Sequence, residues 1–126
     1  MAIHKVLLVD DEPDILRLAQ LSLQAIGRWQ VVCCTSGEEA LVVAAREKPD
    51  AILMDVMMPH LDGPATLAAL QQDAATRDIP VVFMTATNDP EEQARLIAMG
   101  ARGVISKPFA PLSLPERLAA LVAGKS

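Results

Sequence analysis

The sequence lacks several features that would point to particular classes of protein. It has no tyrosine, two phenylalanines, one tryptophan and two cysteines among 126 residues, and it has no run of lysine or arginine. No stretch approaches the roughly 20 consecutive apolar residues of a membrane span, and the apolar run near the N-terminus is too short for a secretory signal. The net charge is −5, whereas nucleic-acid binding needs a basic surface. We therefore expect a cytoplasmic protein that binds neither membranes nor nucleic acid directly.

The two cysteines, Cys33 and Cys34, are adjacent in the sequence. Neighbouring residues of a strand point to opposite faces, so these thiols are poorly placed to form a disulfide with each other or to share a metal ion. We expect both to be reduced packing residues. The chain length fits one domain, and an apolar content of 52% is enough for a core. A single domain over residues 1–126 is predicted, with no output domain after it.

Short apolar runs alternate five times with segments that have the periodicity of amphipathic helices. The predicted strands are Lys5–Val9, Trp29–Cys34, Ala51–Met54, Ile79–Met84 and Val104–Ser106. The predicted helices begin near Pro13, Ser36, Pro64, Asp89 and Ser113, which are residues that start helices well. The strands are continuously apolar rather than alternating, which indicates a sheet that is covered on both faces.

Strict alternation of strand and helix predicts an α/β fold with a parallel, doubly wound sheet. For five strands, the (βα)5 arrangement of the flavodoxin-like fold is favoured, with strand order 2-1-3-4-5. Ligands of such sheets bind beyond the carboxyl ends of the strands, where the strand order reverses. In this order the reversal falls between the first and third strands, so residues that follow these strands are the first candidates for a site.

Polar residues with complementary chemistry follow four of the predicted strands: Asp10, Asp11, Asp55, Thr85 and Lys107. Three carboxylates in one cleft repel one another and favour a bound cation, and oxygen ligands suit magnesium. A carboxylate can attack phosphorus, while a metal, an ammonium and a hydroxyl can stabilise the phosphoryl oxygens. Each residue also has a simpler reading, as a helix-start acid, a turn residue, a strand threonine or a solvated lysine. Their convergence at one sheet edge favours a phosphoryl-accepting site.

The sequence resembles the receiver domains of two-component response regulators from Val6 to about Val122. The resemblance is carried, in this order and spacing, by the segments VLLVDDEP, LMDVMMPHLDG, MTA and SKPF. It implies a signalling protein rather than an enzyme, in which a histidine kinase or a histidine phosphotransfer protein phosphorylates Asp55. The output would then pass through contacts with an unknown downstream protein.

The resemblance also assigns roles to individual residues. Magnesium, or manganese in its place, would bind Asp10, Asp11, Asp55 and the backbone carbonyl of Met57. Thr85, Ala86 and Lys107 would bind the phosphoryl group and report the modification, and the Lys107–Pro108 peptide bond would be cis. Gly63 would serve the turn that ends the acceptor loop, and Gly100 would end the fourth helix.

Two features depart from the common pattern of the family. The aromatic residue that usually stands three positions before the lysine is replaced by Val104, so the usual coupling of the threonine to an aromatic ring cannot operate in its standard form. The positions that tune the lifetime of the acyl phosphate hold Met57 and Thr87. Neither side chain orients a water molecule well, which predicts a phosphoryl group that persists longer than in relatives with polar or acidic residues at both positions.

Three other functions are compatible with the fold. A phosphatase of the haloacid-dehalogenase type would need a second acid at Met57, and a flavodoxin-type electron carrier would need a hydroxyl-rich phosphate loop where Asp10 and Asp11 stand. A receiver-like interaction module that works without phosphorylation is favoured by Val104 and opposed by the complete set of acids, threonine and lysine. By analogy with the family, we expect kinase docking beside the first helix, output through the face of the fourth helix, fifth strand and fifth helix, and a monomer or weak dimer.

Overall fold

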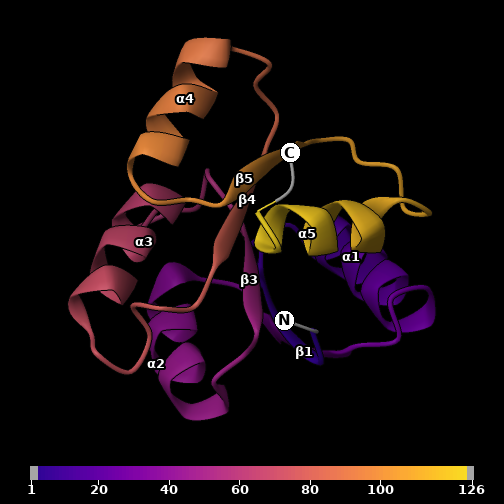
Figure 1. Ribbon diagram of the computed structural model, residues 1–126, viewed down its shortest axis with the longest axis horizontal. Coiled ribbons are helices and arrows are strands. Elements are labelled where there is room, and N and C mark those ends of the chain that lie inside the picture. The colour runs from indigo at the N-terminus through magenta and orange to yellow at the C-terminus, as the bar shows by residue number, and fades with distance from the viewer. Residues whose placement is uncertain (1–2, 125–126) are drawn as a thin grey trace.

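The computed structural model describes residues 3–124, in which five strands and five helices alternate along the chain (Figure 1). The strands are β1 (Lys5–Val9), β2 (Gln30–Cys34), β3 (Ala51–Asp55), β4 (Val81–Thr85) and β5 (Gly103–Ser106). The helices are α1 (Pro13–Ala25), α2 (Gly37–Glu47), α3 (Gly63–Gln72), α4 (Pro90–Ala98) and α5 (Leu114–Val122). All ten predicted elements are present. The largest shift is in β4, which begins after Pro80 rather than at Ile79.

The five strands are all parallel and lie in the order β2-β1-β3-β4-β5. This order confirms the predicted flavodoxin-like fold. β1 is hydrogen-bonded to both β2 and β3, so the chain reverses direction across the sheet beside β1 and β3. The carboxyl ends of these two central strands therefore lie side by side, which is the edge where the candidate site was predicted.

Local side-chain contacts explain where most helices begin and end. Ser36, Asp62 and Asp89 precede α2, α3 and α4, and each side chain accepts a hydrogen bond from a backbone N–H of the first turn. Gly100 follows α4 with φ +114, a conformation that glycine adopts without strain. Ser113 precedes α5 as predicted, but its hydroxyl donates to the carbonyl of Ala110 instead of capping the helix.

The helices cover the sheet in two groups, which Figure 1 shows on either side of the strands. Alternate strand residues, such as Leu7, Ile52 and Phe83, pack with α2, α3 and α4 in one core. The intervening residues, such as Leu8, Leu53 and Ile105, pack with α1 and α5 in the other. Because successive side chains of a strand point to opposite faces, the position of a residue along its strand decides which group of helices it meets.

Both cysteines lie on β2 and are free thiols, as predicted. Cys34 is buried and Cys33 is partly buried. Burial raises the pKa of both thiols, and for Cys34 the neighbouring carboxylate of Glu39 adds to burial and raises the pKa to about 12. These thiols are therefore protonated and packed, which agrees with a structural role.

Among the described residues, no helix has the length and apolar character that crossing a membrane requires. The prediction of a single domain over residues 1–126, with no output domain after it, stays a prediction. Met1, Lys125 and Ser126 lie outside the described residues.

Gly63 is the first residue of α3 and lies against the end of β3. A Cβ atom on Gly63 would come within 2.5 Å of the carbonyl oxygen of Asp55 and 2.8 Å of an edge carbon of Phe83. Its N–H donates to the carbonyl of Val56 at 2.9 Å. Glycine is therefore required here by close packing, rather than by the turn conformation that the sequence suggested.

We predict that Gly63→Ala lowers the free energy of unfolding by about 1–3 kcal/mol, because the added methyl group must displace backbone atoms of β3. Urea unfolding followed by circular dichroism measures this change. The matched control is Ala68→Ser, an addition of similar size at an exposed position of the same helix, which should change stability by about 0.5 kcal/mol or less. A Gly63→Ala protein as stable as the control would contradict the packing argument.

Candidate functional site

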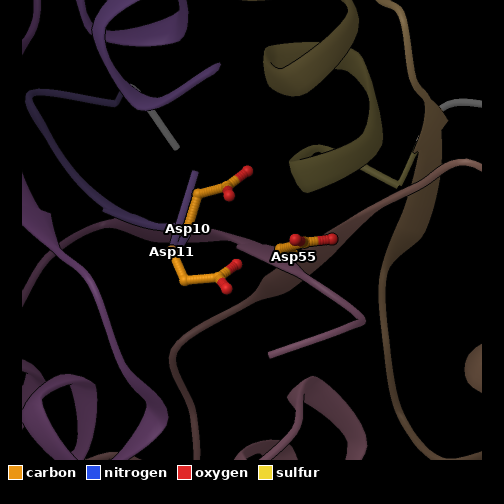
Figure 2. A group of neighbouring side chains, drawn as sticks. All are labelled: Asp10, Asp11 and Asp55. Atoms are coloured by element: carbon orange, nitrogen blue, oxygen red, sulfur yellow. The ribbon is translucent and has the colours of Figure 1, made fainter. Parts of the chain in front are cut away.

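Three carboxylates meet where β1 and β3 end. Asp10 and Asp11 directly follow β1, and Asp55 is the last residue of β3. Figure 2 shows the three side chains grouped at this edge, and one oxygen atom of each carboxylate lies within 4.8 Å of the others. Asp10 is fully buried and Asp55 nearly so, whereas Asp11 is at least partly exposed. The predicted acids are therefore brought together in a single cluster.

Lys107 enters this cluster from β5. Its backbone N–H donates to the carbonyl of Thr85 at 2.8 Å, which continues the pairing of β5 with β4 beyond Ser106. The ammonium Nζ lies 2.9 Å from Oδ2 of Asp10 and 3.1 Å from Oδ2 of Asp55. The side chain of Lys107 is only 10% exposed, and the Lys107–Pro108 peptide bond is cis. The lysine thus provides a positive charge inside the acidic cluster.

The protonation equilibria follow from this arrangement. Burial raises the pKa of Asp55, and the charge of Asp10 raises it further, while the contact with Lys107 lowers it in part. For Lys107, burial by itself lowers the pKa, but the contacts with Asp10 and Asp55 outweigh burial and raise the pKa to about 12. Lys107 is therefore charged at neutral pH, and the carboxylates remain under mutual repulsion.

The cluster also contains an oxygen atom that lacks a hydrogen bond. Oδ2 of Asp10 is fully buried and accepts no hydrogen bond from any described residue. Nζ of Lys107 approaches this oxygen as an ionic contact only. The other oxygen, Oδ1, accepts from the backbone N–H of Glu12 at 2.9 Å. A buried carboxylate oxygen without a donor, next to two further carboxylates, has the chemistry of a ligand for a hard divalent cation such as magnesium.

The acceptor loop after Asp55 adds Met57 to the surroundings of the site. Its backbone N–H lies 3.4 Å from Oδ1 of Asp55, and its side chain projects into solvent with 76% exposure. The predicted metal contact of the Met57 carbonyl remains a prediction. The exposed thioether offers neither an acid nor a base beside Asp55.

Thr85 is the buried last residue of β4, which pairs with β3 and with β5. By the alternation of side chains, Asp55 continues the row of Leu53 on the side of α1 and α5, whereas Thr85 continues the row of Phe83 on the side of α3 and α4. Its hydroxyl accepts a hydrogen bond from the N–H of Thr87 at 3.2 Å. The predicted contacts of Thr85 and Ala86 with a phosphoryl group remain predictions.

Val104 shares the face of Thr85. It is partly buried, lies opposite Phe83 in the pairing of β4 with β5, and packs against the core beneath α4. The substitution of valine for an aromatic residue is therefore compatible with the strand, because a β-branched side chain suits this conformation.

The sequence did not reveal one contact of the site. The carboxylate Oε1 of Glu12 accepts a hydrogen bond from Nζ of Lys107 at 3.2 Å, although the two residues are 95 positions apart. The sequence shows Glu12 only as the third acid of a run at the start of a helix. No pattern within the chain indicates that its side chain turns towards β5.

Comparisons with known proteins agree with this geometry. Residues 6–119 match the model of the response regulator receiver domain family. The chain is 36% identical to the "Probable transcriptional regulator ycf27" of Guillardia theta and to the alkaline phosphatase synthesis transcriptional regulatory protein PhoP of Bacillus subtilis. The aligned parts cover 94% of this chain but only 45% and 48% of those relatives. The chain thus spans about half the length of these curated relatives.

A solved structure gives a match over nearly its full length. The chemotaxis response regulator CheY4 of Vibrio cholerae is 32% identical, with a TM-score of 0.87 and coverage of 94% of this chain and 98% of that chain. The family match over most of the chain, the sheet order and the cluster at the strand ends all lead to the same assignment. This chain belongs to the receiver domains of response regulators, the signalling domains of two-component systems.

Proposed function

We propose that this receiver domain is a switch that accepts a phosphoryl group on Asp55 from a histidine kinase or a histidine phosphotransfer protein. One observation carries the proposal: Asp55 ends a strand within the same cluster as two further carboxylates, and the ammonium of Lys107 lies 3.1 Å from its Oδ2. Such a cluster combines an ionisable nucleophile with a fixed positive charge. Both are needed at a site that accepts a phosphoryl group.

In the proposed reaction, a carboxylate oxygen of Asp55 forms a bond to phosphorus while the bond between phosphorus and the imidazole nitrogen of the donor breaks. The electron pair leaves on that nitrogen, which takes up a proton. Asp55 needs no general base because its carboxylate is the nucleophile once ionised. Lys107 offsets the charge of the phosphoryl oxygens, and Thr85 donates its hydroxyl to one of them.

Asp10, Asp11 and Asp55 are the side chains that would hold a magnesium ion, together with the carbonyl of Met57. The donor set fits this metal because every ligand is an oxygen atom and because Oδ2 of Asp10 is buried without a hydrogen-bond donor. A bound magnesium ion would supply positive charge to the phosphoryl oxygens. The chain itself positions Asp55 and keeps Lys107 beside it.

Output is proposed to run through contacts of α4 with a partner protein. α4 is weakly anchored, because Leu96 is the one buried residue within it. One further contact holds its C-terminal end: the side chain of Gln71 in α3 donates to the carbonyl of Met99, which directly follows α4. Two named relatives are transcriptional regulators of about twice the length. The proposed phosphoryl transfer does not require the additional segment of those relatives, because the carboxylate cluster and Lys107 supply the nucleophile and the positive charge.

Incubation of the protein with phosphoramidate and magnesium is expected to add one phosphoryl group, seen in the intact mass. The adduct should be absent in Asp55→Ala, because the nucleophile is lost, and should be strongly reduced when a chelator removes magnesium. The matched control is Asp78→Ala, which removes an exposed acid that lines a hollow at the opposite edge of the sheet. This variant should be modified as readily as the wild type.

An adduct that persists in Asp55→Ala would contradict the assignment of the acceptor. A wild-type protein without any adduct would favour the alternative of an interaction module that works without phosphorylation. That alternative is favoured by one observation, the valine at position 104.

The phosphoryl group is expected to persist for minutes or longer, because Met57 has no polar group and the hydroxyl of Thr87 is already engaged by the N–H of Asp89 at 3.1 Å. Decay of the phosphorylated protein, followed by intact mass after removal of the donor, measures this lifetime. A double variant, Met57→Asn with Thr87→Glu, should shorten it by supplying groups that orient water. Loss from the wild type within seconds would refute the prediction.

A phosphoryl mimic such as beryllium fluoride is expected to shift backbone amide signals of residues 86–105, because output depends on the Thr85 loop and α4 rather than on an aromatic ring at Val104. Met99 or Phe109 would repack in response. Two-dimensional NMR with and without the mimic tests this expectation, and Asp55→Ala, which cannot bind the mimic, is the control. The absence of shifts across this segment would exclude the proposed route of output.

A further inference from the structure

Three carboxylates surround the ammonium group of Lys107. Nζ lies 2.9 Å from Asp10, 3.1 Å from Asp55 and 3.2 Å from Glu12. Only the contact with Glu12 has the direction of a hydrogen bond. A phosphoryl group on Asp55 would therefore compete with Asp10 and Glu12 for the ammonium of Lys107.

The three partners differ in what else they do. Asp10 and Asp55 are buried and belong to the carboxylate cluster that would hold magnesium. The side chain of Glu12 is 61% exposed. Glu12 occupies the N-cap position of α1, but its side chain makes no capping hydrogen bond there. An N-cap Asp, Asn, Ser or Thr usually accepts from the first turn of its own helix, whereas the longer side chain of Glu12 contacts Lys107 instead.

We propose that Glu12 is a positioning residue that holds Lys107 before phosphorylation and releases it when Asp55 accepts the phosphoryl group. This inference rests on the proposed function of Asp55. Glu12 is the partner that can leave at the smallest cost, because its carboxylate is already largely hydrated. Release of Asp10 from the lysine would leave a buried carboxylate without this counter-charge, and Asp55 itself carries the phosphoryl group.

The role of Glu12 has a consequence for rate. An interaction that is present in the free protein and absent in the transition state slows the reaction. The contact of Glu12 with Lys107 has this property, because the ammonium must turn towards the phosphoryl oxygens as charge develops on them. The contact should have no influence on the loss of the phosphoryl group, since it is already broken in the phosphorylated protein.

The test compares Glu12→Gln with the wild type and with Asp14→Asn. Asp14 lies in the first turn of the same helix, and its carboxylate forms no ion pair within the described part of the chain. Both substitutions remove one negative charge near the site and keep the size of the side chain, but only Glu12→Gln removes the charge that holds Lys107. Rates of phosphorylation by phosphoramidate at saturating magnesium, and rates of phosphoryl loss, are measured for all three proteins.

Glu12→Gln is expected to be phosphorylated about two- to five-fold faster than both the wild type and Asp14→Asn, which is the range for a partly exposed ion pair. Its rate of phosphoryl loss should equal that of the wild type. Thermal unfolding should be unchanged, which excludes a structural cause. Equal phosphorylation rates for Glu12→Gln and the wild type, or an equal increase in Asp14→Asn, would overturn the inference and leave the proposed function intact. A wild-type protein that takes up no phosphoryl group would overturn both.

Discussion

The balance of charge at the carboxyl ends of β1, β3 and β5 is the constraint on which the rest of the site depends. Parallel strands bring Asp10 and Asp55 to the same edge, where burial and proximity make their negative charges costly. The ammonium of Lys107 reduces this repulsion from 2.9 and 3.1 Å away. One positive charge does not neutralise the carboxylates of the cluster. The remaining negative charge makes the site suitable for a divalent cation.

The alternation of side chains along the strands gives the end of β3 and the end of β4 different neighbours. Asp55 continues the row of Leu53 on the side of α1 and α5, whereas Thr85 and Val104 belong to the rows on the side of α3 and α4. Asp55 and the core around Val104 therefore lie on opposite sides of the sheet. The hydroxyl of Thr85 lies at the end of β4, while Phe83, two residues earlier in the strand, packs in the core beneath α3 and α4. In this chain the second side is lined by a valine in place of a ring.

Much of the fold and the cluster follows from the sequence, because both arise from short-range patterns. Continuous apolar runs separated by helical segments determine a doubly wound sheet, and acids or lysine directly after the strands must then meet at one edge. The contact of Glu12 with Lys107 could not be predicted, since it depends on the direction that one exposed side chain takes. The reason for Gly63 was also hidden, because the close approach of α3 to the carbonyl of Asp55 is a matter of tertiary packing.

The absence of a side chain at Gly63 has a mechanical consequence. The first residue of α3 is hydrogen-bonded to the acceptor loop at Val56, while Gln71, near the other end of the helix, is bonded to the carbonyl of Met99 after α4. A hydrogen-bonded helix of ten residues, about 15 Å long, thus joins the backbone beside Asp55 to the terminus of α4. This connection through α3 consists of one backbone hydrogen bond and one from the side chain of Gln71, and it does not involve the residue at position 104.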